Sequence, residues 1–234
     1  MRKENKKYIF ITGNRKGIGR HLTEYYLGHG HGVLGCSRKE SDFVHENYHH
    51  FVCDITDEKG VKQVIRSVRS DFGKVDVLIN NAGVASLNHS LLTPGSTVKK
   101  VFETNFYGSF YFARECAKMM RNTGGRIVNF STVAVPMNLE GEMVYASSKA
   151  AVEKMTKILA KELAPFDITV NAIAPSPVYT DLIKTVPEDK IRGLLHKQAI
   201  RRLGTFEDIE NVLDFFISEK SSFITGQIIY LGGL

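Results

Sequence analysis

The sequence lacks the features of a membrane-spanning, secreted or disulfide-rich protein. No apolar run approaches the about 20 residues that cross a bilayer, and the basic start MRKENKKYIFITG contains only the short apolar stretch YIFI. That stretch predicts a first β-strand and not a signal peptide. The three cysteines, Cys36, Cys53 and Cys116, are an odd number without the spacing of metal ligands. We therefore expect buried thiols in a reducing cytoplasm and no association with a membrane.

The charge and histidine patterns argue against two further classes of protein. Eight histidines are present, but the group His45, His49 and His50 lies in a polar stretch without the ordered spacing of metal ligands. The net charge is +6, and no nucleic-acid-binding motif accompanies it. A modest positive charge suits an anionic cofactor or substrate equally well. We therefore expect no metal site and no nucleic-acid partner.

The order of predicted elements indicates one α/β domain over residues 1–234. Short β-branched and apolar runs alternate with helical patterns, which predicts a Rossmann-type doubly wound parallel sheet with helices on both faces. No linker, repeat or low-complexity segment divides the chain. Strands are predicted at Tyr8–Thr12, Gly32–Cys36, His50–Cys53, Val75–Asn80, Arg126–Phe130, Thr169–Ile173 and Gln227–Tyr230, and helices near 18–29, 59–72, 97–122, 144–163 and 206–218.

A glycine-rich turn, TGNRKGIG at 12–19, follows the first predicted strand. Glycines let backbone amides approach a ligand closely, and the unpaired N–H groups of a helix N-terminus attract a pyrophosphate. A tight structural turn is the alternative, but its position after the first strand of a βαβ unit favours a dinucleotide. The residues expected to contact this dinucleotide are Gly13, Asn14, Arg15, Lys16, Gly17, Ile18 and Gly19.

The residues after the second strand bear on which dinucleotide is bound. Ser37 and Arg38 follow the strand directly, and Lys16 in the glycine turn adds another cation. Arginine here accommodates the 2′-phosphate of NADP, whereas an acidic residue holds the 2′-hydroxyl of NAD. Glu40 is the rival signal, but it lies too far past the strand end to reach the ribose. The sequence therefore favours NADP(H), with NAD(H) as the alternative.

A phenol and an ammonium lie four residues apart in the predicted helix MVYASSKAAVEKM. This spacing places Tyr145 and Lys149 on one face, one turn apart. An ammonium about 4 Å from a phenolate attracts it by about 4 kcal/mol at an effective dielectric of about 20. We therefore expect Lys149 to lower the pKa of Tyr145 from its ordinary value of about 10 toward neutrality. Taken alone, a Tyr and a Lys at this spacing more often lie on a solvated helix face, so the other motifs decide whether these two residues are catalytic.

Together the motifs resemble those of the classical short-chain dehydrogenase/reductases. The likeness covers essentially the entire chain, and RLG at 202–204 with the C-terminal strand is most similar to the 3-oxoacyl-(acyl-carrier-protein) reductase branch. The resemblance implies an NAD(P)-dependent oxidoreductase that reduces a ketone to a secondary alcohol. The matching motifs, in chain order, are the glycine turn, Asp54, NNAG at 80–83, Asn105, Tyr145-x-x-x-Lys149 and ITGQ at 224–227.

The resemblance also implies a role for each matched residue. Tyr145 would donate a proton to the substrate, and Lys149 would hold the nicotinamide ribose. Asn105 would distort its helix and anchor a water that relays protons to Lys149, and Asp54 would accept from the adenine amino group. Beyond the glycine turn, the residues expected to bind the cofactor are Ser37, Arg38, Asp54, Ile55, Asn81, Ala82, Gly83, Tyr145, Lys149, Pro175, Val178 and Thr180.

Two positions depart from the family pattern. Thr132 stands where the family usually has the second serine of a Ser-Ser pair, and Ser131 precedes it. Threonine keeps the hydroxyl but is stiffer at χ1, so we expect Thr132 to orient the substrate carbonyl, with Ser131 as a backup. The expected catalytic set is therefore Asn105, Thr132, Tyr145 and Lys149. Ser176 replaces a glycine that often follows the proline, and is interpreted as a tolerated turn residue.

The substrate is the least defined part of the prediction. Residues 181–204 are basic and amphipathic and would form a mobile lid, as in the family. Their cations could meet a phosphopantetheine or an acidic acyl carrier protein, although solvated helix faces are the simpler interpretation. Thr123 and Phe166 stand near positions where carrier reductases have cations, so free ketones are equally good candidates.

Further partners and rival functions follow from the same resemblance. The helix with NFYGSFYFARECAKMM is apolar on two faces, and the family's homotetramer would bury the second one through this helix, the Tyr145 helix and the last strand. An NAD-dependent alcohol or sugar dehydrogenase is one rival function. A non-catalytic nucleotide-binding regulator is the other.

Overall fold

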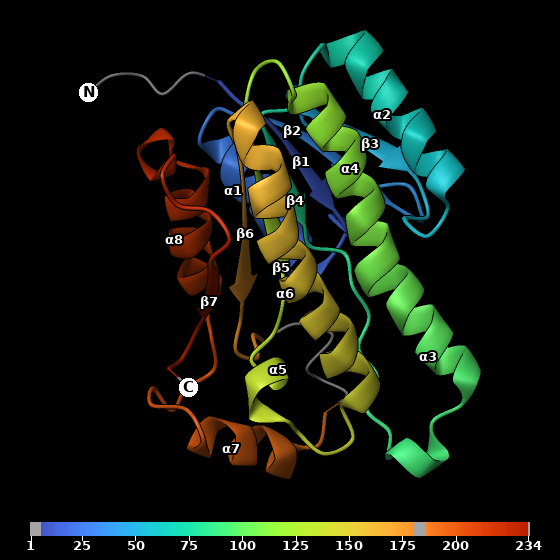
Figure 1. Cartoon of the computed structure of the whole chain (residues 1–234), viewed down its shortest axis with the longest axis vertical. Coiled ribbons are helices and arrows are strands. Elements are labelled where there is room, and N and C mark those ends of the chain that lie inside the picture. The colour runs from blue at the N-terminus through green and yellow to red at the C-terminus, as the bar shows by residue number, and fades with distance from the viewer. Residues whose placement is uncertain (1–5, 180–185, 234) are drawn as a thin grey trace.

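A parallel seven-stranded sheet forms the centre of the computed structural model, which describes residues 6–179 and 186–233 (Figure 1). The strand order is β3-β2-β1-β4-β5-β6-β7, so the chain moves from β1 to one edge and then returns to β4 on the other side of β1. Such a reversal is the switch point at which α/β sheets bind ligands. The strands are β1 Tyr8–Thr12, β2 Gly32–Ser37, β3 Tyr48–Val52, β4 Val77–Asn80, β5 Gly125–Phe130, β6 Ile168–Ala174 and β7 Ile228–Tyr230.

Helices cover both faces of this sheet, which confirms the predicted fold class. Successive side chains of β1 face opposite sides: Ile9 and Ile11 enter the core beneath α1 and α8, and Phe10 enters the core beneath α2, α4 and α6. Figure 1 shows α6 and α4 lying across the sheet. The helices are α1 Gly17–Gly28, α2 Glu58–Phe72, α3 Gly95–Phe102, α4 Ser109–Met120, α5 Ala134–Met137, α6 Met143–Leu163, α7 Glu188–His196 and α8 Phe206–Ile217, with 3-10 turns at Ser90–Leu92, Ala164–Phe166 and Glu219–Ser221.

The structure differs from the predicted elements at several places, among them the start of β4 at Val77 and the short helix α5. The helix predicted over 97–122 is divided by a π-helical turn, Glu103–Gly108, between α3 and α4. Strand β3 begins two residues before the predicted start, because Tyr48 pairs with Val33 of β2. Helix α7 was not predicted and occupies part of the proposed lid, of which residues 181–185 lie outside the described residues. Among the helices that the structure describes, none combines the length and apolar character needed to cross a bilayer.

Candidate active site

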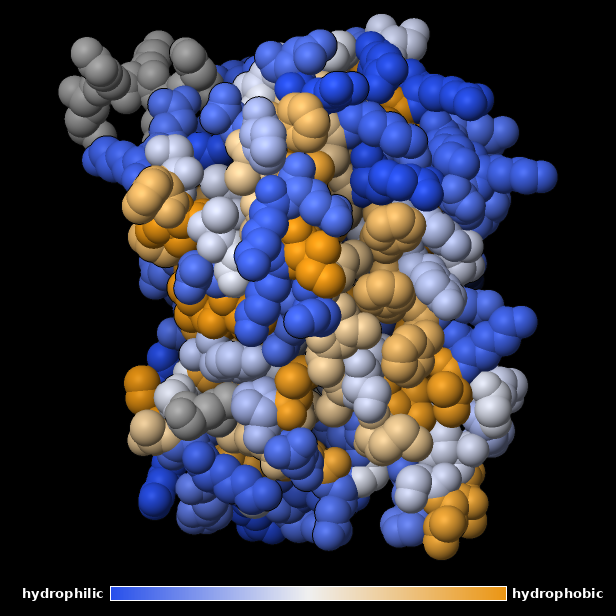
Figure 2. Space-filling model, viewed as in Figure 1, coloured by the Kyte–Doolittle hydropathy of each residue, from blue (hydrophilic) through white to orange (hydrophobic). Residues whose placement is uncertain are grey.

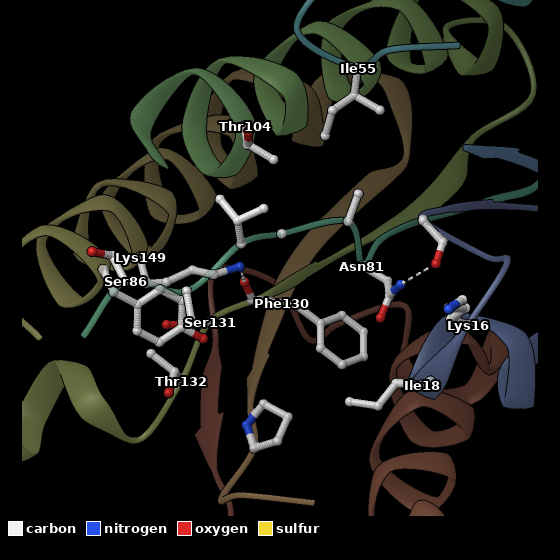
Figure 3. A pocket seen from close by; sticks show the side chains of 18 of the residues that line it. Lys16, Ile18, Ile55, Asn81, Ser86, Thr104, Phe130, Ser131, Thr132 and Lys149 are labelled. Carbon is white, nitrogen blue, oxygen red and sulfur yellow. Dashed lines mark hydrogen bonds between the residues drawn. The ribbon is translucent and has the colours of Figure 1, made fainter. Parts of the chain in front are cut away.

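A cleft of about 840 Å³ runs along the carboxyl ends of the strands at the switch point (Figure 3). Its size lies within the range of about 300–1,000 Å³ that is typical of small-molecule sites. Lys16 and Ile18 lie at one end of the cleft, and Thr132 and Lys149 lie at the other. The predicted residues that line it are Gly13, Arg15, Lys16, Gly17, Ile18, Ser37, Arg38, Asp54, Ile55, Asn81, Ala82, Gly83, Thr132, Tyr145, Lys149, Pro175 and Val178.

Three predicted residues lie behind the cleft wall and not in it. The amide of Asn14 is fully buried and donates to the Tyr48 hydroxyl at 2.7 Å, so this side chain points away from the cleft, and a contact of Asn14 with a dinucleotide stays a prediction. Gly19 and Asn105 are also buried and serve the packing of the site. Thr180, predicted to bind the nicotinamide carboxamide, lies outside the described residues.

The glycine turn is held against the loop after β4. Gly13 and Gly17 have φ values of 69° and 54°, which residues with a side chain rarely adopt. A Cβ on Gly19 would lie 2.5 Å from both the Gly13 oxygen and the amide nitrogen of Asn81. The same amide nitrogen donates to the Thr12 carbonyl at 2.9 Å. The N-terminus of α1 carries no side-chain cap, so its free N–H groups suit a pyrophosphate.

The cleft is positively charged at the end of β2. Ser37, Arg38 and Lys39 line it there, together with Arg15 of the glycine turn. The rival residue Glu40 is not among the lining residues. A cluster of cations at the end of β2 suits a phosphate better than a ribose hydroxyl.

Two residues of α6 contact the end of β5. The ammonium of Lys149 is only 3% exposed and donates to the Phe130 carbonyl at 2.7 Å (Figure 3). One turn earlier, Tyr145 lines the cleft together with Thr132, whose hydroxyl lowers the Tyr145 pKa. A phenol and an aliphatic hydroxyl that line the same part of a cleft can hold one carbonyl oxygen between them. The sequence therefore identified a group of side chains that the fold does bring together.

The electrostatics of the pair differ from the prediction. Burial raises the pKa of Tyr145 to about 12, and the hydrogen bond with Thr132 and the charge of Glu142 are smaller influences. Burial also lowers the pKa of Lys149 to about 8. The expected lowering of the Tyr145 pKa by Lys149 is therefore wrong for the protein alone, because desolvation dominates. The ammonium bonds to a main-chain carbonyl and leaves the phenol protonated.

Ser131 does not duplicate the hydroxyl of Thr132. Its Oγ donates to the carboxylate of Glu153 at 2.5 Å, and the same carboxylate accepts from the Tyr230 hydroxyl at 2.8 Å. Glu153 is 8% exposed and lies one turn beyond Lys149 on the same face of α6. Because the only hydroxyl proton of Ser131 is used in this bond, the expectation that Ser131 serves as a backup is wrong.

Asn105 anchors the loop after β4 to helix α6. Its amide nitrogen donates to the Ser148 hydroxyl and to the Val84 carbonyl, both at 2.9 Å, and its oxygen accepts from the Val84 N–H at 2.8 Å. These bonds form where the helix widens into the π-helical turn. None of these bonds reaches Lys149, so the water relay to Lys149 stays a prediction.

The end of the cleft beyond Thr132 is mainly apolar. Leu87, Val133 and Ala134 line it from the sheet side, and Val186 and Leu194 line it from the lid. Burial raises the pKa of the nearby Glu142 carboxyl.

The base of the lid is tied to the strand at the end of the chain. Ser176 and Gln198 are both buried, and the Ser176 hydroxyl donates to the Gln198 side-chain oxygen at 2.5 Å. The backbone N–H of Ile200 donates to the Gly232 carbonyl at 2.9 Å, and that of Ala199 to the Gly233 carbonyl at 3.0 Å. Ser176 is therefore a structural partner of the lid and not merely a tolerated turn residue.

Sequence reasoning missed the polar residues behind the cleft wall. Glu153 could have been found, because it continues the spacing of four from Tyr145 and Lys149 along α6. Gln198 and Tyr48 carry no local signal, since their partners are distant in sequence. In the part of the chain that the structure describes, no group of His, Cys, Asp or Glu is arranged to hold a metal ion.

Comparisons with known proteins agree with this geometry. Residues 12–233 match the family model described as enoyl-(acyl carrier protein) reductase. The chain therefore belongs to the short-chain dehydrogenase/reductase family, as its motifs predicted. Within that family it is an NAD(P)-dependent oxidoreductase.

The similar proteins extend over nearly the whole chain. The sequence is 31% identical to 3-oxoacyl-(acyl-carrier-protein) reductase FabG of Escherichia coli (strain K12), covering 97% of this chain and 96% of the relative. It is 33% identical to FabG of Staphylococcus epidermidis, with coverages of 97% and 98%. Among solved structures, ligand-free aldohexose dehydrogenase of Thermoplasma acidophilum has a TM-score of 0.88 at 28% identity, with coverages of 98% and 94%. ElxO with NADP bound has a TM-score of 0.88 at 29% identity and coverages of 97% and 97%.

Replacing Gly19 with alanine is expected to disrupt the glycine turn. The new Cβ would meet the Gly13 carbonyl at 2.5 Å and the Asn14 Cα at 2.9 Å, and these backbone atoms have little room to move. We expect a loss of about 1–3 kcal/mol in unfolding free energy and weaker dinucleotide binding, measured by denaturant titration and calorimetry. Gly28→Ala is the control, because a Cβ there meets nothing within 4 Å. Equal stability and equal dinucleotide affinity of the Gly19→Ala and Gly28→Ala variants would contradict the close approach of the backbone to Gly19.

Substitutions of Ser131 and of Thr132 are expected to have different effects: the first should lower stability, and the second should lower turnover. Ser131→Ala leaves the buried Glu153 with one donor, which should cost about 1–3 kcal/mol of unfolding free energy and change kcat little. Thr132→Val keeps the side-chain shape but removes a hydroxyl at the reacting carbonyl, which should lower kcat about 100- to 1,000-fold. Denaturant unfolding and steady-state kinetics of both variants provide the measurement. The assignment fails if Ser131→Ala lowers kcat as much as Thr132→Val.

The buried Lys149 should make stability rise with pH. Its pKa in the folded protein, about 8, lies below the value of about 10.4 in an unfolded chain. Between these pH values the unfolded chain binds the extra proton, so the unfolding free energy increases with pH by up to about 3 kcal/mol. Lys149→Met should lack this increase when both proteins are unfolded by urea at pH 7, 8, 9 and 10. Parallel pH profiles would show that the ammonium is not desolvated.

Proposed function

We propose that this protein is an NADPH-dependent ketoreductase that reduces a ketone to a secondary alcohol. The observation that carries the proposal is the arrangement of one cleft. Tyr145, Lys149 and Thr132 meet at one end of it, and the glycine turn with its cations forms the other. A dinucleotide laid along the cleft would bring its nicotinamide toward Tyr145 and its adenosine half toward Arg38.

The preference for NADPH over NADH is supported by charge. Arg38, Lys39 and Arg15 line the cleft where the 2′-phosphate would lie, and Glu40 does not line it. ElxO, one of the similar solved structures, has NADP bound. The residues present therefore fit the phosphorylated cofactor better than NADH.

The geometry supports a different role for each of the three polar side chains, Thr132, Tyr145 and Lys149. A bound reduced nicotinamide supplies the hydride. Thr132 donates a hydrogen bond to the carbonyl oxygen of the substrate as negative charge builds there. Tyr145 then transfers its proton to that oxygen, and its raised pKa keeps it protonated and ready to donate. The N–H groups of Lys149 that do not bond to Phe130 are available for the ribose hydroxyls.

A 3-oxoacyl thioester is the substrate class that we favour. The lining beyond Thr132 is apolar, with Leu87, Val133 and Leu194, which suits an acyl chain. The FabG relatives are named for this activity on an acyl carrier protein. Arg121 lies over the Phe166 ring at 5.1 Å, near one expected carrier contact, so a carrier-bound thioester is a candidate alongside a free one.

We also propose a cytoplasmic homotetramer. The thiols of Cys36, Cys53 and Cys116 are free and buried, as suits a reducing compartment. Figure 2 shows apolar residues in a band over α6 and α4, bordered by hydrophilic residues over α2. Ile158 and Met143 of α6 are 45% and 48% exposed, and an interface between copies would cover them. Light scattering of the purified protein measures the number of copies.

Tyr145→Phe tests the proposed chemistry directly. It removes the proton donor and keeps the ring, so kcat should fall by about 100- to 10,000-fold while the affinity for NADPH stays within about twofold. Lys149→Ala should weaken both turnover and cofactor binding. Tyr107→Phe, at a tyrosine that is 46% exposed, is the matched control and should behave as the wild type. Retention of full turnover by Tyr145→Phe would rule out the mechanism.

A substrate screen distinguishes the candidate functions. Loss of NADPH absorbance with acetoacetyl-CoA, with an acetoacetyl carrier protein and with simple ketones tests reduction. NAD or NADP reduction with alcohols and aldohexoses tests the dehydrogenase alternative. Binding of NADPH with no turnover of any substrate would favour a regulator and would overturn the proposed activity.

A further inference from the structure

A chain of hydrogen bonds connects the glycine turn to the segment that follows β2. The Asn14 amide donates to the Tyr48 hydroxyl at 2.7 Å, and that hydroxyl lies 2.9 Å from Nδ1 of His50. On its other side, Nε2 of His50 lies 3.0 Å from the Lys39 carbonyl oxygen and 3.1 Å from Oγ of Ser37. His50 and Tyr48 belong to β3, an edge strand that does not line the dinucleotide cleft at these positions.

The partners of His50 determine where its ring proton lies. The Lys39 carbonyl can only accept, so Nε2 carries the proton and donates it. Burial lowers the pKa of His50, which favours the neutral ring. Nδ1 of a neutral ring must then accept, and it does so from the Tyr48 hydroxyl, which in turn accepts from Asn14. With Asn14 as the donor, a neutral His50 ring accepts at Nδ1 and donates at Nε2, which assigns both the tautomer and the orientation of the ring.

The neighbouring residues leave space for this arrangement. Gly35 of β2 is paired with His50 of β3, and a Cβ on Gly35 would overlap the side chain of Asn14. The Asn14 side chain therefore packs over Gly35, a strand residue without a side chain, directly behind the glycine turn. The chain of bonds ties together the two segments that supply the cations of the cleft.

His50 changes what Ser37 can do. The Ser37 hydroxyl donates to the Lys39 carbonyl at 2.6 Å, and His50 donates to the same oxygen. If the Ser37 proton turns toward a phosphate in the cleft, His50 still satisfies the carbonyl. Without His50, that turn would leave the carbonyl of Lys39 without a donor, at a cost in binding.

We propose that His50 is a positioning residue that selects the 2′-phosphomonoester of the dinucleotide. It holds the segment 37–39 in place and frees the Ser37 hydroxyl for the phosphate. A dinucleotide with a plain 2′-hydroxyl gains much less from this, because it brings no phosphate for Ser37 and Arg38 to bind. The inference rests on the cofactor preference within the proposed function.

Calorimetry with NADP⁺ and NAD⁺ on the full-length protein tests this role. We expect His50→Ala to weaken NADP⁺ binding about fivefold to tenfold, as the loss of a hydrogen bond predicts, and to leave NAD⁺ binding within about twofold. His50→Gln should restore most of the NADP⁺ affinity, because its amide can still donate to the Lys39 carbonyl. His49→Ala is the matched control, since His49 lies on the opposite face of β3 against Phe51 and Phe72.

The outcomes separate this inference from the proposed function. Equal weakening of NADP⁺ and NAD⁺, or no change for either, in a folded His50→Ala protein would overturn the role of His50 alone. Failure of His50→Gln to recover affinity would do the same. A wild-type protein that binds NADP⁺ no more tightly than NAD⁺ would remove the cofactor preference itself. ¹⁵N NMR of the His50 ring should show a proton at Nε2, and a proton at Nδ1 would contradict the chain of bonds.

Discussion

The attachment of α6 to the carboxyl end of β5 is the constraint on which the site depends. Three residues of α6, spaced four apart, contact three consecutive residues at the end of β5. Lys149 bonds to the carbonyl of Phe130 and Glu153 to Ser131, and Tyr145 lines the cleft beside Thr132. The two bonds are buried, so the loss of either partner would leave a polar group without water or protein to satisfy it. The helix cannot slide or rotate without losing both bonds, and Tyr145 therefore keeps its place beside Thr132.

The sheet supplies the second requirement, a cleft that joins this group to a nucleotide site. The strand order reverses at β1, so the connections after β1 and β4 lead to opposite sides and leave space between the two loops. Asn81 links those loops through the Thr12 carbonyl, and the glycines allow the backbone to come close. The cores on the two faces of the sheet fix the strands below, so the site is built on rigid elements.

Much of this could be predicted because it depends on local chemistry. The glycine turn, the alternation of strands and helices and the pair Tyr145 and Lys149 follow from spacing and composition. The pKa of Tyr145 could not be predicted, because it depends on how deeply the folded chain buries the phenol. The partner of Ser131 and the position of Asn14 were missed for the same reason: Glu153 and Tyr48 meet them only after folding. Spacing identifies residues on one helix face, but it does not show which groups compete for their hydrogen bonds.

The backbone hydrogen bonds from Ala199 and Ile200 to the carbonyls at 232–233 have a practical consequence for handling the protein. The residues that follow β7 hold the base of the proposed lid through these bonds. A bulky fusion or an immobilising linker attached there would strain them, whereas one attached at the opposite terminus would not. Attachment through the amino terminus therefore leaves substrate access undisturbed.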